Sequence, residues 1–378
     1  MKYPQKGGVN VKKEPLYMQI YHYLKEKIIT GELEPNMQLP TELDLAEQFG
    51  VSRITSKRAL MELENENLIY RRRGSGSFVK ERIEQKYIKS KKDENKIISM
   101  ILPFDGSTGL AGYIHGAVEY ASAQGYSLTI HTTRERSSME RELLLQLPRN
   151  GIQGIIIYPL QDNKNVDVLY HLYLEKYPTI TIDKYFDSVP LCSICSDNFQ
   201  GGYLAADYFI QKGHTRIAFV SSIGIEHITS IRSRYFGYCK ALKDHGISFD
   251  ENMIFCQPIQ GTMETYYEML VQNLVNQKVT AVQTENDYVA VELLKACIRI
   301  GILVPEQISI IGFDNLEFTA YVEIPLTTIE QKFFEIGMKA AKSLITWIET
   351  GKNPATKEVL PVSLIERESV TSLIYPLL

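Results

Sequence analysis

A polar and basic segment opens one predicted helix, in QFGVSRITSKRALMEL, residues 48–63. Its first turns carry hydroxyl and cationic side chains, while the apolar stripe of the same helix faces another side. Guanidinium and ammonium groups bind guanine O6 and N7 or phosphate oxygens. A solvated charged face is the ordinary alternative, so the neighbouring segments must decide. The residues concerned are Arg53, Thr55, Lys57 and Arg58.

The segment before this helix favours DNA binding. LPTELDLAEQFG, residues 39–50, predicts a short helix with a capping box at Thr41 and an end at Gly50, and Ser52 is placed to cap the next helix. Two helices joined by a short glycine turn, the second with a basic start, form a helix-turn-helix, whose second helix enters the major groove. We therefore expect the four residues above to contact DNA, and Ile54 to touch a thymine methyl group.

A basic hairpin follows the second helix. YRRRGSGSFVK, residues 70–80, predicts a strand, a glycine-serine turn and a second strand, with Gly74 and Gly76 where positive φ is needed. A hairpin with a cationic stem and a tip of small residues can follow a minor groove, which makes it a wing. Arg72 and Arg73 in the stem and the two tip glycines are the predicted DNA contacts. The alternative is again a solvated run of charge.

Another group of polar residues follows predicted strands in the larger, C-terminal part of the chain. Asp183 follows TITI, Asn286 follows AVQTE and Asp314 follows ISIIGF. Ligands of open α/β sheets bind beyond such strand ends, and carboxylates and amides suit the hydroxyls of a polyol. With Arg234, on a segment that opens a helix, these residues predict a sugar clamp, to which we add Tyr158 at the end of the third strand. The alternative is that these polar residues only stabilise the turns that follow the strands.

Catalytic and cofactor motifs are missing from the same region. It contains no glycine-rich phosphate loop, zinc-ligand spacing or nucleophile elbow. Cys192 and Cys195 form a CxxC, but no second pair or histidine cluster completes a zinc site, so they are interpreted as residues of a buried strand. An enzyme such as an aminotransferase, fused to the same kind of DNA-binding domain, would need a cofactor-binding lysine in a recognisable context and usually a longer body, and neither is evident. The chain is therefore expected to be no enzyme and to need no cofactor and no metal.

The elements that position these residues fall into three regions. An amphipathic helix with apolar residues at Leu16, Ile20, Leu24 and Ile28 precedes the helix-turn-helix. Beyond a charged stretch, strand-like and helical patterns alternate over about 280 residues, which predicts an α/β fold with parallel sheets in two lobes. The expected domains are a winged helix-turn-helix at 14–80, a linker at 81–96, and an effector-binding and dimerisation domain at 97–378.

Composition and charge fit this division. The chain has 378 residues, 44% of them hydrophobic, and its apolar runs are shorter than the roughly 18–20 residues that span a bilayer. Residues 1–96 carry a net charge of +5 and the remainder −9, which gives the total of −4 and suggests a polyanion partner for the first part. A cytoplasmic protein without a membrane partner is expected. A secreted sugar-binding protein would show a signal segment.

The first region resembles the GntR-type winged helix-turn-helix domain. The resemblance runs from PLYMQIYHYLKEKIITGELEP to GSGSFV and includes the LPTE, VSR and AL landmarks. It implies DNA contacts at positions matching Thr41, Ser52, Arg53, Thr55, Lys57 and Gly76. Two positions depart from the pattern. Leu43 stands where many relatives carry a DNA-contacting arginine, and Ser56 replaces a usual apolar core residue.

Residues 96–372 resemble the effector-binding module of the LacI-GalR family, a two-lobed fold similar to periplasmic sugar-binding proteins. The landmarks include SDNFQGGYLAADYFIQKGHTRIAFV, RYFGY, TENDYVA and GILVPEQISIIGFDN, in that order. The resemblance implies that Arg234, Asn286 and Asp314 bind the effector and that Asp183 is a polar pocket residue. It places Gln331 and Phe333 at the crossover between lobes, where an aromatic side chain packs against the ligand.

The combination of these two regions is similar to the arabinose repressors of Gram-positive bacteria. It implies a homodimer that binds a two-fold symmetric DNA operator and releases it when L-arabinose closes the lobes of the sensor. The same architecture can respond to another sugar or to a non-sugar metabolite such as a purine, and these alternatives stay open.

Overall fold

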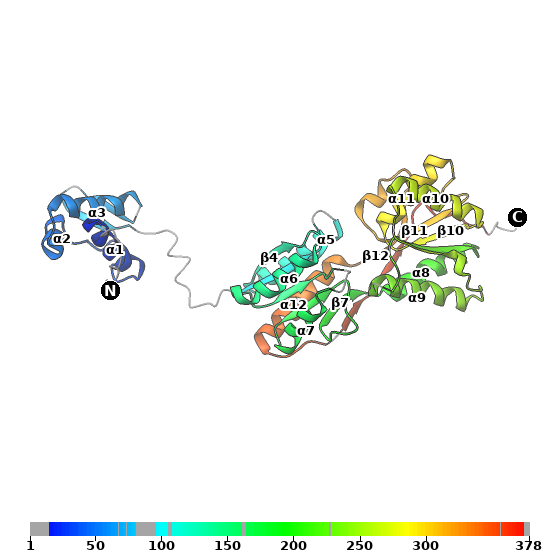
Figure 1. Ribbon diagram of the computed structural model, residues 1–378, viewed down its shortest axis with the longest axis horizontal. Coiled ribbons are helices and arrows are strands. Elements are labelled where there is room, and N and C mark those ends of the chain that lie inside the picture. Colours follow the sequence, from blue (N-terminus) through cyan, green and yellow to red (C-terminus); the bar gives the residue numbers. More distant parts are fainter. Residues whose placement is uncertain are drawn as a thin grey trace, which may run out of the picture. The chain divides into compact units, whose positions relative to one another are not determined.

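The computed structural model describes residues 15–66, 68–72, 74–80, 96–104, 108–160, 164–226, 228–355 and 357–373. The chain divides into an N-terminal unit, residues 1–94, and a C-terminal unit, residues 95–378 (Figure 1). The predicted linker at 81–96 lies outside the described residues except for Lys96, and so does Arg73 of the predicted wing. Within the described part, each helix falls short of the length and apolar character that a membrane crossing requires.

The N-terminal unit is three helices and a two-stranded antiparallel hairpin around one small core. Ile20 and Leu24 from the first helix, Leu45 from the second and Leu60 and Leu63 from the third are almost fully buried in it. These elements are α1(Leu16–Ile29), α2(Glu42–Phe49), α3(Arg53–Asn65), β1(Ile69–Arg72) and β2(Gly76–Val79). The fold predicted for this region is confirmed.

Local signals determine the boundaries of α2 and α3. Thr41 and Asp44 form the expected capping box at the start of α2, and Gly50 ends it with a φ of 62°. Ser52 caps α3 by accepting a hydrogen bond from the backbone N–H of Thr55. Of the four apolar residues that give the predicted first helix its spacing, Ile20, Leu24 and Ile28 are buried. The Leu16 side chain is 54% exposed, and Tyr17 and Met18 cover the core at the first turn of α1.

The C-terminal unit consists of two α/β lobes, each built on a six-stranded sheet. In the first lobe all strands are parallel, in the order β13-β7-β6-β5-β3-β4. Its elements are β3(Ile97–Leu102), α5(Thr108–Ala123), β4(Ser127–Thr132), α6(Ser137–Gln146), β5(Ile155–Ile157), α7(Val166–Leu174), β6(Thr179–Ile182), β7(Cys192–Ser196), α12(Phe333–Thr350) and β13(Lys357–Leu360).

The second lobe has the strand order β14-β12-β11-β10-β8-β9, in which β14 alone is antiparallel to its neighbour. Its elements are α8(Asn198–Gln211), β8(Ile217–Ser221), α9(Thr229–Asp244), β9(Ile254–Cys256), α10(Met263–Asn276), β10(Ala281–Thr284), α11(Asp287–Ile300), β11(Ser309–Asp314), β12(Thr327–Glu330) and β14(Ser363–Ile365). The two-lobed fold with largely parallel sheets is therefore confirmed, and Cys192 and Cys195 are buried in strand β7.

The chain passes between the lobes three times, from β7 to α8, from β12 to α12 and from β13 to β14 (Figure 1). Each crossing begins at the carboxyl end of a strand. Strands β6, β10 and β11 end at the same side of their sheets. The strand-end residues singled out from the sequence therefore lie where the two lobes face each other.

In each lobe, glycines allow one pair of helices to touch through their backbones. In the second lobe, a Cβ on Gly202 of α8 would lie 2.0 Å from the carbonyl oxygen of Arg234, and a Cβ on Gly237 of α9 would lie 2.0 Å from the carbonyl oxygen of Phe199. The contact is therefore reciprocal. It leaves no room for a methyl group on either helix, and it fixes the position of Arg234 on α9.

In the first lobe, α5 and α12 make the same kind of glycine-mediated backbone contact. A Cβ on Gly116 would lie 1.9 Å from the carbonyl oxygen of Phe334, and a Cβ on Gly337 would lie 2.0 Å from that of Tyr113. The position of Tyr113 is thereby fixed against α12 in the way that Arg234 is fixed against α8. Both residues face the space between the lobes.

We expect Gly202→Ala to lower the free energy of unfolding of the C-terminal unit by about 1–3 kcal/mol, because the new methyl group forces α8 and α9 apart. Urea denaturation followed by circular dichroism and by the fluorescence of Trp347, the one tryptophan of the chain, measures this change. Gln200→Ala, at an exposed position of the same helix, is the control and should change stability by less than about 0.5 kcal/mol. Equal stability of the two variants would contradict the backbone contact.

Candidate functional site

The starts of α2 and α3 and the tip of the hairpin surround one surface depression of the N-terminal unit. Its lining includes Thr41, Arg53, Arg72, Gly74 and Gly76, which are five of the predicted DNA contacts. The two glycines have φ values of 79° and 104°, as the predicted turn requires. The other predicted contacts near the start of α3 do not line the depression. Of these, Ser52, Lys57 and Arg58 are exposed and Thr55 is half-buried.

The hydroxyl groups predicted to contact DNA also hold the helix starts. Thr41 donates to the Asp44 carboxylate over 2.7 Å and accepts from the Asp44 backbone over 3.2 Å. The Ser52 and Thr55 hydroxyl oxygens are 2.9 Å apart. Each hydroxyl therefore has a local partner and keeps an acceptor site for a further one.

Two residues that the sequence reasoning missed orient the cationic side chains. Glu42 accepts a hydrogen bond from Arg53 Nε at 3.1 Å and lies 3.7 Å from Arg71 Nη1, so it links the start of α3 to the hairpin. The guanidinium carbon of Arg58 lies 4.0 Å from the ring centroid of Tyr17 on α1. The sequence gives no signal for this second pair, because 41 positions separate the two residues.

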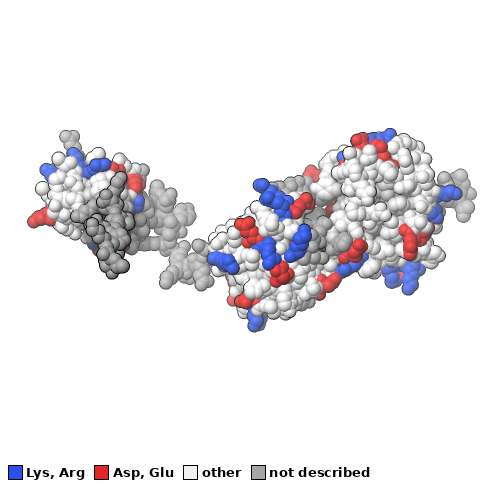
Figure 2. Space-filling view, viewed as in Figure 1, with Lys and Arg blue, Asp and Glu red and all other residues white. Residues whose placement is uncertain are grey.

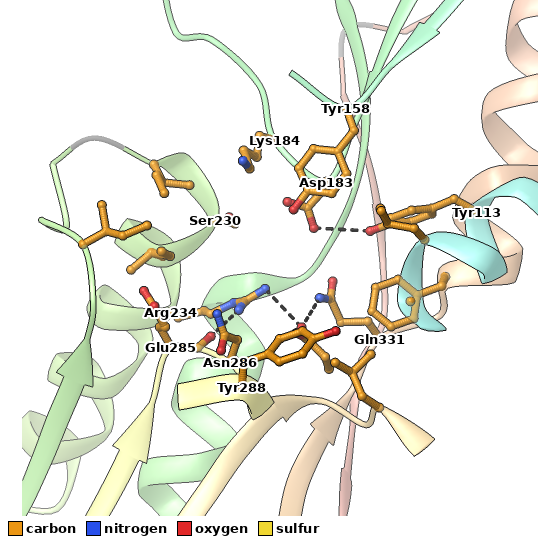
Figure 3. A pocket seen from close by; sticks show the side chains of 18 of the residues that line it. Tyr113, Tyr158, Asp183, Lys184, Ser230, Arg234, Glu285, Asn286, Tyr288 and Gln331 are labelled. Atoms are coloured by element: carbon orange, nitrogen blue, oxygen red, sulfur yellow. Dashed lines mark hydrogen bonds and ion pairs between the residues drawn. The ribbon is translucent and has the colours of Figure 1, made fainter. Parts of the chain in front are cut away.

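All seven residues predicted to bind an effector line a single cavity of about 180 Å³ between the lobes (Figure 3). The first lobe contributes Tyr158, Asp183 and Phe333, and the second lobe contributes Arg234, Asn286 and Asp314. Gln331 lies on the crossover from β12 to α12.

A buried guanidinium organises the second-lobe side of the cavity. Arg234 Nε donates to Asn198 Oδ1 at 2.8 Å, and Nη1 donates to the carbonyl oxygen of Glu285. Its Nη2 lies 3.8 Å from Asp314 Oδ1, and the guanidinium carbon lies 3.6 Å from the Phe313 ring centroid. Since every nitrogen has a partner, the side chain holds one conformation, with its outer edge toward the cavity (Figure 3).

Gln331 leaves one hydrogen-bonding atom without a partner in the described part of the chain. Its amide nitrogen donates to Asp314 Oδ1 at 2.6 Å, whereas its buried Oε1 accepts no hydrogen bond. Figure 3 shows this oxygen on the side of the cavity that faces the first lobe. An unpaired buried acceptor costs about 1–3 kcal/mol, so a ligand that donates a hydrogen bond here gains correspondingly.

The first-lobe side of the cavity combines a carboxylate, an ammonium group and phenols. Tyr113 donates to Asp183 Oδ1 at 3.2 Å, and Lys184 Nζ lies 4.6 Å from the Tyr158 ring centroid. Burial lowers the pKa of Lys184 to about 8, although the neighbouring Asp183 opposes this change. Burial also raises the pKa of both tyrosines well above the usual value, so their hydroxyls remain donors at neutral pH.

The strand-end carboxylates lie in strained backbone conformations. Asp183 has a φ of 67° and Asp314 a φ of 125°, a region that side chains disfavour. Burial raises the pKa of Asp314 to about 7, and Arg234 lowers it in part. Both features cost folding free energy, which is typical of residues retained for binding.

The structure also qualifies one predicted residue and adds several. Asn286 caps α11, because its Oδ1 accepts from the Val289 backbone at 2.9 Å, so its amide N–H groups remain to face the cavity. Lys184 and Glu285 also line the cavity and directly adjoin predicted residues, so widening each strand-end prediction by one position finds them. Tyr113, Ser230 and Tyr288 lie on helices, where the strand-end pattern gives no signal.

The described residues offer no metal centre, since no group of three or more His, Cys, Asp or Glu side chains gathers among them with suitable geometry. On the face of the C-terminal unit shown in Figure 2, Lys and Arg are interspersed with Asp and Glu. The net negative charge of this unit therefore forms no single patch on that face.

Comparison with known proteins agrees with both units. Residues 16–79 match the bacterial regulatory proteins of the gntR family, and residues 206–370 match the periplasmic binding protein-like domain. The arabinose metabolism transcriptional repressor of Geobacillus stearothermophilus is 30% identical over 347 residues, which cover 89% of this chain and 92% of that protein. The resemblances identified from the sequence are confirmed.

Further relatives share the larger part of the chain. The HTH-type transcriptional repressor PurR of Histophilus somni is 31% identical over 290 residues, which cover 75% of this chain and 84% of that protein. A LacI family transcriptional regulator from Enterococcus faecium, solved with bound ribose, superimposes with a TM-score of 0.63 at 26% identity, over 74% of this chain and 100% of that one.

We expect Asp314→Asn to make the C-terminal unit more stable at pH 8 and its stability less dependent on pH. With a folded pKa raised to about 7 from 3.8, Asp314 holds a proton in the folded state that the unfolded chain has lost, so its burial lowers stability as the pH rises from about 4 to 7. Thermal unfolding between pH 4 and 8 measures this effect. Glu317→Gln, at an exposed position, should leave the pH profile unchanged. An identical profile for Asp314→Asn and the unsubstituted protein would rule the assignment out.

Proposed function

This chain belongs to the GntR-type bacterial regulators with a periplasmic-binding-protein-like sensor, the family of the arabinose metabolism repressors, and we propose that it represses carbohydrate utilisation genes. In this proposal the N-terminal unit binds operator DNA in the cytoplasm. A sugar that binds in the cavity of the C-terminal unit releases the operator, and L-arabinose is the first candidate. The DNA contacts and cavity residues above are its proposed sites.

The observation that carries the proposal is the chemistry of the cavity in a chain that also has a winged helix-turn-helix. Carboxylates at Asp183 and Asp314 and the free Oε1 of Gln331 accept hydrogen bonds, while Arg234 and Lys184 donate them. A sugar offers hydroxyls that do both. The binding of a neutral polyol needs no chemical step, so the proposal involves no enzyme activity.

The size of the cavity favours a small sugar. Its volume of about 180 Å³ lies below the range of about 300–1,000 Å³ in which drug-sized ligands bind. The rings of Tyr113 and Phe333 lie edge to face, 5.1 Å apart, and supply an apolar wall. A monosaccharide has an apolar ring face for such a wall and hydroxyls for the polar side.

The proposed mechanism is a shift between two arrangements of the lobes. Sugar contacts groups on both lobes at once, so it stabilises a closed arrangement more than an open one. The lobes also meet directly, since Thr229 Oγ1 exchanges hydrogen bonds with the backbone of Tyr185 and Arg232 forms an ion pair with Asp187 at 2.6 Å. A ten- to hundredfold loss of operator affinity needs about 1.4–3 kcal/mol of coupling.

A homodimer is part of the proposal, because a two-fold symmetric operator is read by two recognition helices. Closure of the lobes then changes the spacing of the two N-terminal units, and this change weakens the grip on DNA. Whether each promoter is repressed depends on where its operator lies.

A purine is the second candidate effector. Tyr113, Tyr158 and Phe333 give the cavity aromatic walls on which a flat base can stack. The polar lining argues for a sugar instead, since the strand-end aspartates Asp183 and Asp314 both line the cavity. A thermal-shift panel of pentoses, hexoses and nucleobases separates the two candidates.

The test of the function uses the purified full chain in a gel-shift assay on the promoter next to its own gene, with and without sugars of the panel. We expect a specific complex that L-arabinose weakens at least tenfold. Absence of a specific complex, or a complex that ignores every compound in the panel, would overturn the proposal.

Two substitutions act as reciprocal controls in that assay. Arg53→Ala should abolish the specific complex and leave the sugar-induced thermal shift intact, because it removes a cation of the recognition helix. Arg234→Ala should form the complex but no longer respond to sugar, because the cavity loses its central donor. Circular dichroism checks that both variants fold. Loss of both DNA binding and the response to sugar in either variant would contradict the assignment of these two activities to separate units.

A further inference from the structure

Two large aliphatic side chains stand exposed among the polar residues of the proposed DNA surface. Ile54 is 80% exposed and Leu43 is 63% exposed, the highest values for large hydrophobic side chains among the described residues of the N-terminal unit. Isolated exposed aliphatic residues are common on proteins and by themselves indicate no function. Their positions carry the inference.

Both residues occupy the second position of a helix whose start belongs to the proposed DNA surface. Ile54 follows Arg53 in α3, and Leu43 follows Glu42 in α2. The two helix starts are joined, since Arg53 bonds the Glu42 carboxylate and the Ser56 hydroxyl donates to the Glu42 carbonyl oxygen at 2.6 Å. The two aliphatic side chains are therefore presented by one rigid corner of the molecule.

The residues around Ile54 and Leu43 have the charge and polarity that suit the major groove of DNA. Leu43 and Arg53 line the same depression as Arg72 and Gly76, and Lys57 lies exposed one turn beyond Ile54. Cationic side chains attract the phosphates on either side of a groove. Inside the groove, the C5-methyl group of thymine is the apolar group that the bases present, and aliphatic side chains pack against it.

Building on the proposed DNA-binding function, we propose that Ile54 and Leu43 are specificity-determining residues that read thymine C5-methyl groups of the operator. Hydrogen bonds from Arg53 suit a guanine, whereas neither aliphatic side chain can hydrogen-bond to a base. Each half-site therefore carries thymines at two positions that the protein recognises by shape and apolar contact. Cytosine at these positions is disfavoured, because it lacks the methyl group.

The test first selects preferred duplexes from a random pool with the full chain. Each thymine of the selected half-site is then replaced, one at a time, by deoxyuridine, which keeps all hydrogen-bonding groups and removes the methyl group alone. For the unsubstituted protein we expect about a fourfold loss of affinity at each of two positions, the value for one buried methylene group. Replacement of the other thymines should change little.

The variants assign each position to a side chain. Ile54→Ala should bind thymine and deoxyuridine equally at one position and keep the penalty at the other, and Leu43→Ala should show the reverse. Both substitutions are at exposed sites, so the core is preserved. Leu16→Ala, which truncates a 54% exposed leucine at the start of α1, is the matched control and should keep both penalties.

The outcomes separate this inference from the function on which it rests. If no duplex is enriched, the DNA-binding proposal itself fails. If a duplex is enriched but every deoxyuridine is neutral, or the penalties persist in Ile54→Ala and Leu43→Ala, methyl readout is refuted while DNA binding stands. Unchanged DNA binding by both variants together with lost repression in cells would assign the corner to a protein partner and also refute the inference.

Discussion

The buried guanidinium of Arg234 is the interaction on which the cavity of the C-terminal unit depends. A charge that is almost fully buried is tolerated when it is paired and hydrogen-bonded. Here Asn198 and the Glu285 carbonyl oxygen accept hydrogen bonds from Arg234, and Asp314 lies within ion-pair distance of it. The closely packed glycines of α8 and α9 fix the backbone that carries this side chain. Through Asp314 the same network reaches Gln331, which lies at a crossover between the lobes. The proposed binding site and the crossover between the lobes are thus linked by hydrogen bonds and one ion pair.

The cavity combines features that lower stability and favour binding. Two strand-end aspartates have positive φ values, Asp314 is buried with a raised pKa, and Gln331 keeps an acceptor unpaired. Selection for stability alone would eliminate each of these features. Their concentration at one place supports the view that the cavity exists to hold a ligand that supplies the missing hydrogen bonds. The N-terminal unit differs, because its proposed contact residues also cap and join its helices, so its DNA surface is formed without strain of this kind.

The elements and their order were largely readable from the sequence, for local reasons. The capping box of Thr41, the end of α2 at Gly50 and the positive φ values at Gly74 and Gly76 each depend on a few neighbouring residues. Strands with continuous apolar runs were also identified. The short strands β9, β12, β13 and β14 were not, because they lack an apolar run long enough to stand out. Three of them lie at sheet edges, and β12 lies beside a crossover. The exposure of Leu16 was not readable, since periodicity alone does not say where a helix meets the core.

What the sequence determined by itself was therefore the two units, the polar strand ends and the basic helix start, because these follow from spacing within one element. What tertiary structure alone decided was which side chains meet. Tyr113 with Asp183 and Arg58 with Tyr17 are brought together from positions distant in the chain, and Glu42 meets Arg53 through the packing of two neighbouring helices. The free oxygen of Gln331 and the burial of Lys184 likewise depend on how two lobes close around a cavity. No pattern within one element encodes these contacts, because each depends on how separate helices and sheets pack against one another.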